Sequence, residues 1–78
     1  MPRYFFDTRT DDRVVHDNEG IDLSDLHAAR AQATEALADM ANDVIPSERA
    51  QTLSVEVRDD AGQPVLKASV WSEVQVLA

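Results

Sequence analysis

The stretch DLSDLHAARAQATEALADMANDVI, residues 22–45, decides the fold because it carries the longest helical pattern in the chain. Apolar side chains recur in it at spacings of three and four residues, the period of an amphipathic helix; they are Leu26, Ala29, Ala33, Leu37, Met40 and Val44. Alanine, the strongest helix former, is abundant throughout the stretch. A helix of about twenty residues spans roughly 30 Å, which is enough to cross a small sheet.

Both ends of this predicted helix carry local signals. Asp22 or Ser24 can cap the N-terminus, and Asp25 adds negative charge near the positive end of the helix dipole. Pro46 disfavours helical geometry in the residue before it, so the helix is predicted to end near residues 43–45.

Before the helix, the sequence predicts two short strands. Residues 3–8 are rich in aromatic side chains, and residues 13–17 follow a turn signal at residues 10–12. The segment Asn18–Gly20 then breaks the chain, because Gly20 can adopt a positive φ.

After a connector at residues 46–51, the sequence predicts a second hairpin. Residues 52–58 alternate apolar and polar side chains, and residues 64–71 form the return strand. Between them lies DDAG, with Gly62 suited to the left-handed position of a bulged turn. The order β-β-α-β-β predicts a two-layer α+β fold, a four-stranded, mainly antiparallel sheet covered on one face by one long helix.

Size and composition limit the classes of protein that the chain can represent. With 78 residues, the chain is expected to form one domain over residues 1–78, with residues 72–78 as a loose tail or an added strand. The absence of cysteine excludes thiolate metal sites and cysteine nucleophiles. Neither a signal peptide nor a membrane-spanning apolar run is recognisable, so a cytoplasmic protein without membrane contact is expected.

The net charge of −8 bears on the kind of partner. Only seven basic residues are present, and they are scattered along the chain, whereas binding to a phosphate backbone depends on clustered Lys and Arg. The charge therefore disfavours nucleic acid and favours a basic protein partner.

No catalytic, cofactor-binding or metal-binding residues are predicted. The two histidines, His16 and His27, are eleven residues apart in sequence and lack a further set of converging ligands. The serines lie in no pattern of an activated nucleophile, and Gly20 and Gly62 are too few for a phosphate-binding loop.

Two surfaces are candidates for protein binding. Glu35, Asp39 and Asp43 recur every four residues along the helix, and like charges at this spacing slightly destabilise a helix. This acidic stripe is therefore interpreted in one of two ways, as a docking site for a basic partner or as a solvated face. Large apolar side chains on both faces of the terminal strands suggest an apolar interface, most simply in a homodimer; its candidates are Tyr4, Phe5, Phe6, Val65 and Trp71. Alternation in the first strand separates Phe5 from Tyr4 and Phe6.

Three segments carry a resemblance to a known family: MPRYFFD at 1–7, NEGIDLSDLHAARAQA at 18–33 and VEVRDDAGQPVL at 55–66. The chain resembles short bacterial proteins classed as a domain of unknown function, a resemblance that implies no activity. The segment DLSDLHAARAQATEAL at 22–37 is also similar to small acidic antitoxins, although their additional strand before the helix is absent.

Together these observations favour a small acidic module that binds another protein or itself, without catalysis. One alternative is an antitoxin-like regulator that binds a basic protein. The other is a minor enzyme or a small-ligand-binding protein.

Overall fold

The computed structural model describes residues 1–44 and 51–78, apart from the side chain of Val44. Most of the predicted connector, residues 46–51, therefore lies outside the described residues, as does the side chain of Val44. The elements are β1 (Arg3–Thr10), β2 (Arg13–Val15), β3 (Ile21–Asp22), α1 (Leu26–Val44), β4 (Gln51–Arg58) and β5 (Pro64–Ser72).

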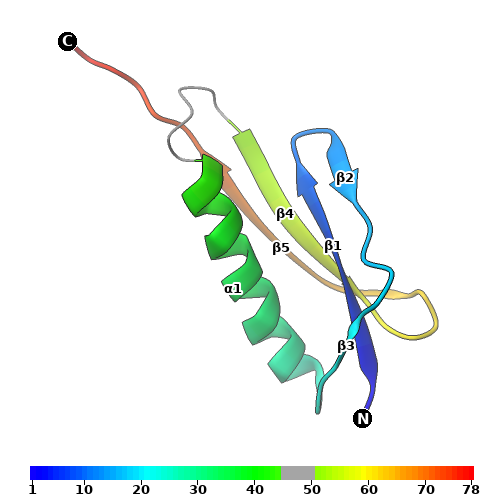
Figure 1. Cartoon of the computed structure of the whole chain (residues 1–78). Helices are drawn as coiled ribbons and strands as arrows, with labels where there is room; N and C mark the ends of the chain where they lie inside the picture. The colour runs from blue at the N-terminus through cyan, green and yellow to red at the C-terminus, as the bar shows by residue number, and fades with distance from the viewer. Residues whose placement is uncertain (45–50) are drawn as a thin grey trace.

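The strands form one antiparallel sheet in the order β2-β1-β4-β5, and α1 covers one of its faces (Figure 1). This arrangement confirms the predicted two-layer α+β fold. The prediction of four strands is incomplete, because β3 pairs with the beginning of β1 as a fifth strand. A two-residue strand has too little periodicity to be recognised from sequence; its position depends on the partner strand.

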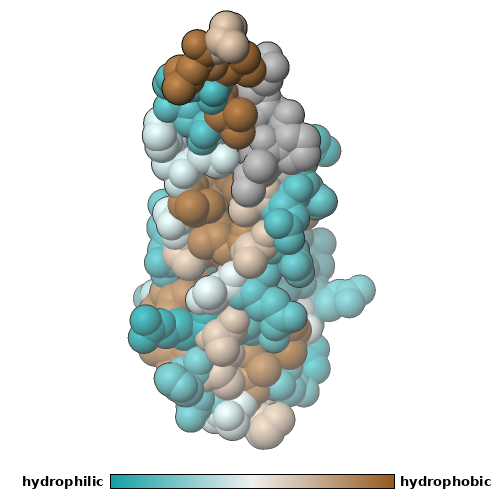
Figure 2. All heavy atoms as spheres, turned by 90° about the vertical axis from the view of Figure 1, so that its left-hand side faces the viewer, coloured by the Kyte–Doolittle hydropathy of each residue, from teal (hydrophilic) through white to brown (hydrophobic). Residues whose placement is uncertain are grey.

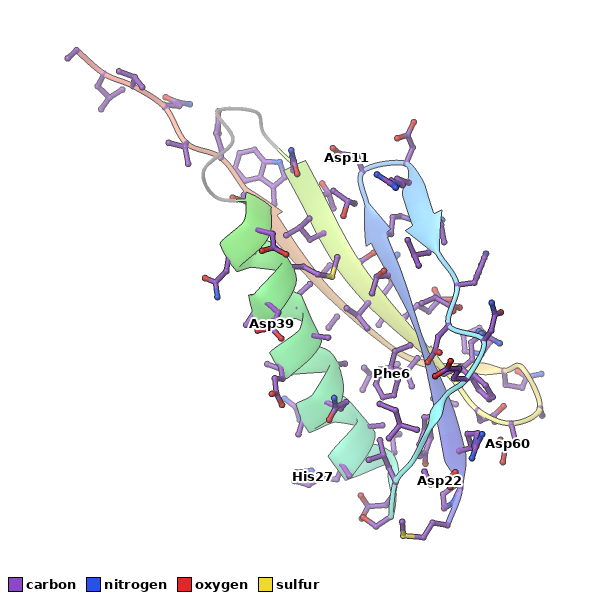
Figure 3. The ribbon with its side chains drawn as sticks, in the orientation of Figure 1. Phe6, Asp11, Asp22, His27, Asp39 and Asp60 are labelled. Carbon is purple, nitrogen blue, oxygen red and sulfur yellow. The ribbon has the colours of Figure 1, made fainter. Side chains whose placement is uncertain are left out.

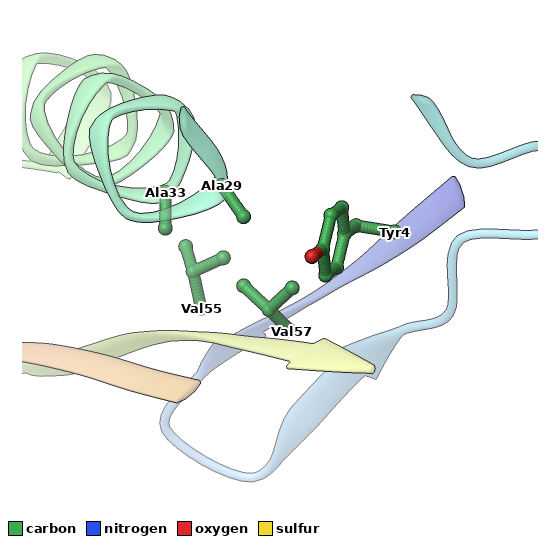
Figure 4. Packing of buried hydrophobic residues seen from close by; sticks show 5 residues of the cluster. All are labelled: Tyr4, Ala29, Ala33, Val55 and Val57. Atoms are coloured by element: carbon green, nitrogen blue, oxygen red, sulfur yellow. The ribbon is translucent and has the colours of Figure 1, made fainter. Parts of the chain in front are cut away.

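The core lies between α1 and the central part of the sheet. Its buried side chains pack together in Figure 4; they are Tyr4, Ala29, Ala33, Val55 and Val57. Ala29 and Ala33 are fully buried, so the helix presents its smallest side chains where it lies closest to the sheet. Phe6 packs against this cluster from β1 and lies between β1 and α1 in Figure 3.

Asp25 caps the N-terminus of α1. Its Oδ1 accepts a hydrogen bond of 2.9 Å from the amide of Ala28, the geometry by which a capping carboxylate satisfies a free helical N–H. The prediction of Asp22 or Ser24 as the cap is therefore wrong, because Asp22 belongs to β3 and pairs with Arg3. The described part of the helix reaches Val44, and residue 45, the last in the predicted range for its end, lies outside the described residues.

The β4–β5 hairpin turns at Asp59–Gly62, as predicted. Gly62 has φ of 82°, and its amide donates to the carbonyl of Asp59 at 3.0 Å. The Asp59 carboxylate accepts two further bonds, from the amides of Ala61 and Gln63, each at 2.9 Å. The turn therefore fixes where β5 begins.

Residues 73–78 continue from β5 without entering the sheet and extend away from it (Figure 1). Ser72, the first residue of the predicted tail, belongs to β5, and residues 73–78 contain no strand.

Candidate functional site

An ion pair between Asp7 and Arg58 organises the face of the sheet opposite α1. Both residues lie on neighbouring central strands, and their side chains alternate away from the core residues of β1 and β4. Arg58 Nε donates to Asp7 Oδ2 at 2.7 Å, and Nη2 donates to Oδ1 at 3.1 Å. Because this bidentate pair is largely buried, with Asp7 only 9% exposed, it is a structural contact and leaves little of the carboxylate available for catalysis.

The loop between β2 and β3 is fastened to the same ion pair. Asp7 Oδ1 accepts a bond of 3.0 Å from the amide of Asp17, and Arg58 Nη2 donates to the carbonyl of Asp17 at 3.1 Å. The Asp17 carboxylate in turn accepts bonds from the amides of Phe6, Glu19 and Gly20. Asp7, Asp17 and Arg58 therefore connect two strands and one loop, a network that sequence reasoning missed.

The network stabilises the ionised form of both acids. Hydrogen bonds from Arg58 hold the pKa of Asp7 below its usual value, despite the opposing effect of burial. For Asp17, burial acts to raise the pKa, but the backbone amides of Gly20, Phe6 and Glu19 together outweigh it and lower the pKa.

Phe5 lies within this polar face and is covered from two sides. The Arg58 guanidinium carbon is 5.2 Å from the centroid of the Phe5 ring, a cation–π contact. A Cβ added to Gly20 would lie 2.9 Å from the ring of Phe5 and 2.8 Å from Cγ of Arg3, so the glycine backbone packs directly against both side chains. Phe5 is therefore part of the domain's own packing.

A shallow groove of about 190 Å³ runs along the same face. Its lining is mostly polar or charged; the residues are Asp7, Thr8, Arg9, Val14, His16, Ser54, Glu56 and Lys67. His16 Nδ1 lies 3.6 Å from Asp7 Oδ1, and the His16 side chain is largely exposed. Within residues 1–44 and 51–78, no three His, Asp or Glu side chains converge as metal ligands.

The five residues predicted to form an apolar interface do not share one surface. Tyr4 and Phe6 pack beneath α1, Phe5 is covered by the network, and Val65 is half-buried beside the core. Trp71 is 62% exposed and lies opposite Thr52 on the face away from α1. Of the predicted set, Trp71 is thus the one that offers a large free apolar area.

Other exposed apolar side chains lie close to Trp71 in sequence, on β5 and the tail. Val70, Val74, Val76 and Leu77 are exposed, with Val76 at 71% and Leu77 at 92%. Figure 2 shows hydrophobic atoms at the top of the molecule, where the C-terminal segment lies. β5 is also an edge of the sheet, with β4 as its neighbour on one side and no described strand on the other.

The acidic stripe is exposed along α1, as Glu35, Asp39 and Asp43 all face solvent. None of the three forms an ion pair with another described residue of the chain. His27 and Asp39 both lie on α1 in Figure 3. The helix has no basic residue in its last turn to offset these charges.

The fold and these surfaces define a small two-layer α+β domain. It has a partly buried polar network on one face of the sheet and a strand, β5, at one edge. Residues 3–71 match the family model of a domain of unknown function, DUF6894, and the chain belongs to this family. Comparisons with curated proteins and with solved structures returned no significant match. The helix that the structure describes is not long and apolar enough to span a membrane.

Proposed function

We propose that the chain is a non-catalytic protein-binding module, and that it binds through the outer edge of β5 together with residues 73–78. The observation that carries the proposal is the outer edge of a nine-residue strand that pairs there with no strand of residues 1–44 or 51–78 and continues into an exposed apolar tail. An open edge offers backbone N–H and C=O groups that a strand of another chain can pair with. We also propose that the protein is bacterial and located in the cytoplasm, as expected from the sequence.

The two edges of the sheet differ in a way that supports this choice. At the other end of the strand order is β2, which has only three residues, and β3 beside β1 has two; short edge strands are a usual means of avoiding unwanted pairing. β5 has nine residues, of which Lys67 is the one with a charge. β5 is thus a much longer edge strand than β2, although it begins with Pro64, carries Lys67 and has an irregular register with β4 between Val57 and Arg58.

The face opposite α1 supports binding less well. Its central apolar residue, Phe5, is covered, and its groove is shallow and lined by charges of both signs. A pocket for a small ligand is usually larger, concave and mainly apolar, with few polar groups. On this face of the sheet, these features favour neither a minor enzyme nor a ligand-binding protein.

Site-specific photo-cross-linking in the native host tests the proposal. A photoreactive amino acid at Val76 or Ser69 is expected to capture a defined protein, because both positions lie along the proposed binding surface. The matched control carries the same amino acid at Asp12, which is exposed in the β1–β2 turn. Equal capture from Asp12, or no capture from the β5 positions, would contradict the proposal.

A second candidate function uses the acidic stripe. The exposure of Glu35, Asp39 and Asp43 without counter-ions in the described part of the chain favours docking of a basic protein, as in an antitoxin-like regulator. Recovery of a basic partner should fall when all three residues are changed to Gln or Asn. Unchanged recovery would rule this docking out.

A further inference from the structure

We infer that the partner at the β5 edge is a second copy of this chain, paired antiparallel about a two-fold axis at Val70. This inference rests on the proposed function, because it names the occupant of the same edge. In such a pair, each residue of one copy faces the residue equally far from Val70 on the other side in its partner. The five-stranded sheets of the two copies would then join into one continuous sheet.

The charges of the edge select this register. Between Pro64 and Ala78 the charged side chains are Lys67 and Glu73, one of each sign and three residues on either side of Val70. Pairing about Val70 therefore places Lys67 of each copy directly opposite Glu73 of the other, twice in the dimer. Opposite charges in directly facing positions stabilise a sheet, whereas like charges destabilise it.

Neighbouring registers lose this match. A sheet keeps its two faces only if the pairing shifts by two residues at a time, since a shift of one turns every side chain to the other face. About Ser69, Lys67 would face Trp71, and about Trp71, Lys67 would face Gln75. The register about Val70 is thus the one among these that pairs both charges.

The apolar residues agree with the same register. Val74 of one copy faces Leu66 of the other on the side of α1, and Val70 faces its own counterpart. On the opposite side, Trp71 faces Ser69, a small residue beside which the indole ring has room to lie across the joint. Val70, Trp71 and Val74, all exposed in the single chain, would be covered together.

The tail already has the geometry that the pairing needs. Gln75 Nε2 donates to Glu73 Oε1 at 2.7 Å, a contact between residues two apart, which extended backbone brings to the same face. Residues 73–76 can therefore pair with the partner's β5 without a large change of conformation. The edge itself is close to neutral, so the net charge of −8 lies mostly elsewhere on the molecule.

A charge-exchange cycle tests the inference, with the dissociation constant of the dimer measured by sedimentation equilibrium. Glu73→Lys places Lys opposite Lys67 at two positions and is expected to weaken the dimer about tenfold. The same change lowers the net negative charge, which by itself would strengthen association. Asp12→Lys, with the same change of charge at the opposite edge, should not weaken the dimer.

The double variant Lys67→Glu/Glu73→Lys restores both opposite-charge pairs and should bind more tightly than either single variant. Lys67 also faces Glu56 on β4 of its own chain, so Lys67→Glu puts two acids side by side. The double variant has the same unfavourable contact with Glu56, so comparing its dissociation constant with that of Lys67→Glu cancels this cost. Dissociation constants of the double variant no better than those of the single variants would overturn the register.

The cross-linking experiment separates failure of this inference from failure of the proposed function. Capture of the same chain from Val76 supports the dimer. Capture of only a different protein there, with sedimentation as a monomer up to near-millimolar concentration, overturns the dimer and leaves the β5 edge as a protein-binding site. No capture and a strict monomer would overturn both.

Discussion

At the scale of single residues, Asp7 has the widest structural role. Its carboxylate joins β1 to β4 through Arg58 and holds the amide of Asp17 in the loop before β3. Arg58 would keep its charge and lose its partner if Asp7 were removed. The amide of Asp17 would lose its acceptor as well, and a partly buried donor left without a partner costs free energy.

Asp7→Ala is therefore expected to lower the free energy of unfolding by about 2–3 kcal/mol, less than for a fully buried pair because Arg58 is partly exposed. Urea unfolding followed by circular dichroism measures the change. The control is Asp12→Ala, at an exposed turn position, which should change stability by less than about 0.5 kcal/mol. Equal effects of the two changes would contradict the role of the network.

The same pair predicts how stability depends on pH. The pKa of Asp7 is lower in the folded chain than in the unfolded chain. The pKa of an unperturbed Asp is about 3.9. The contribution of Asp7 is therefore fully present above that value and is lost as the pH falls through the lower, folded pKa. The acid-induced loss of stability should be smaller in Asp7→Ala than in the unaltered chain.

Sequence reasoning did not find this network, because its members lie far apart in the chain. Asp7 and Arg58 are separated by 51 positions, and each lies in a strand whose local pattern predicts only alternation. A polar residue on the solvated face of a strand is ordinary, so neither residue stands out. Pairing becomes visible only when the register of β1 against β4 is known.

At the scale of elements, local patterns predicted most of the architecture. The helix follows from its period and the second hairpin from the turn at Gly62, because each depends on residues close in sequence. β3 and the capping role of Asp25 were missed for a common reason. Arg3 binds Asp22 with two nitrogens, at 2.9 and 3.3 Å, and so draws it into the sheet and away from the helix.

The candidate surfaces were predicted less completely than the fold. The acidic stripe follows from helical geometry alone, and all three of its members are exposed as that geometry requires. The sequence does not show which residues of the predicted apolar interface are buried and which are exposed. The reason is that the packing of the whole sheet decides which face of β1 lies beneath α1. The position of β5 at an edge of the sheet depends on strand order, which no local pattern encodes.

The acidic stripe should weaken its own helix. Glu35 and Asp39, and Asp39 and Asp43, are like-charge pairs four residues apart, and Asp43 lies near the negative end of the helix dipole. Changing the three to Gln, Asn and Asn is expected to raise the free energy of unfolding by about 0.5–1 kcal/mol. Thermal unfolding measures the difference.

A matched control separates this local effect from that of net charge. Neutralising three exposed acids outside the helix, Asp12, Glu19 and Asp60, removes the same total charge without touching α1. The gain should be clearly smaller in this control. A gain of the same size would assign the effect to the overall charge of −8.

At the scale of the whole molecule, the two sides of the sheet differ in what they leave open. α1 covers one face, the network and the loop of residues 16–20 cover part of the other, and the short β2 ends one edge. Small domains bury a modest share of their surface and have little stability to spare. Extending the sheet through a second copy would bury more surface and so raise the stability of the domain. Stability and assembly are then linked.

That linkage predicts a melting temperature that rises with protein concentration. Association stabilises the folded chain by mass action, and a tenfold increase in concentration should raise the melting temperature by about 3 °C. A chain ending at Glu73 loses Val74 and Val76, which are exposed in the single copy and face Leu66 and Pro64 of the partner in the dimer. Its melting temperature should depend less on concentration, yet equal that of the intact chain at the lowest concentration measured by differential scanning fluorimetry. A lower melting temperature of the shortened chain at every concentration would instead mean that the tail stabilises its own domain.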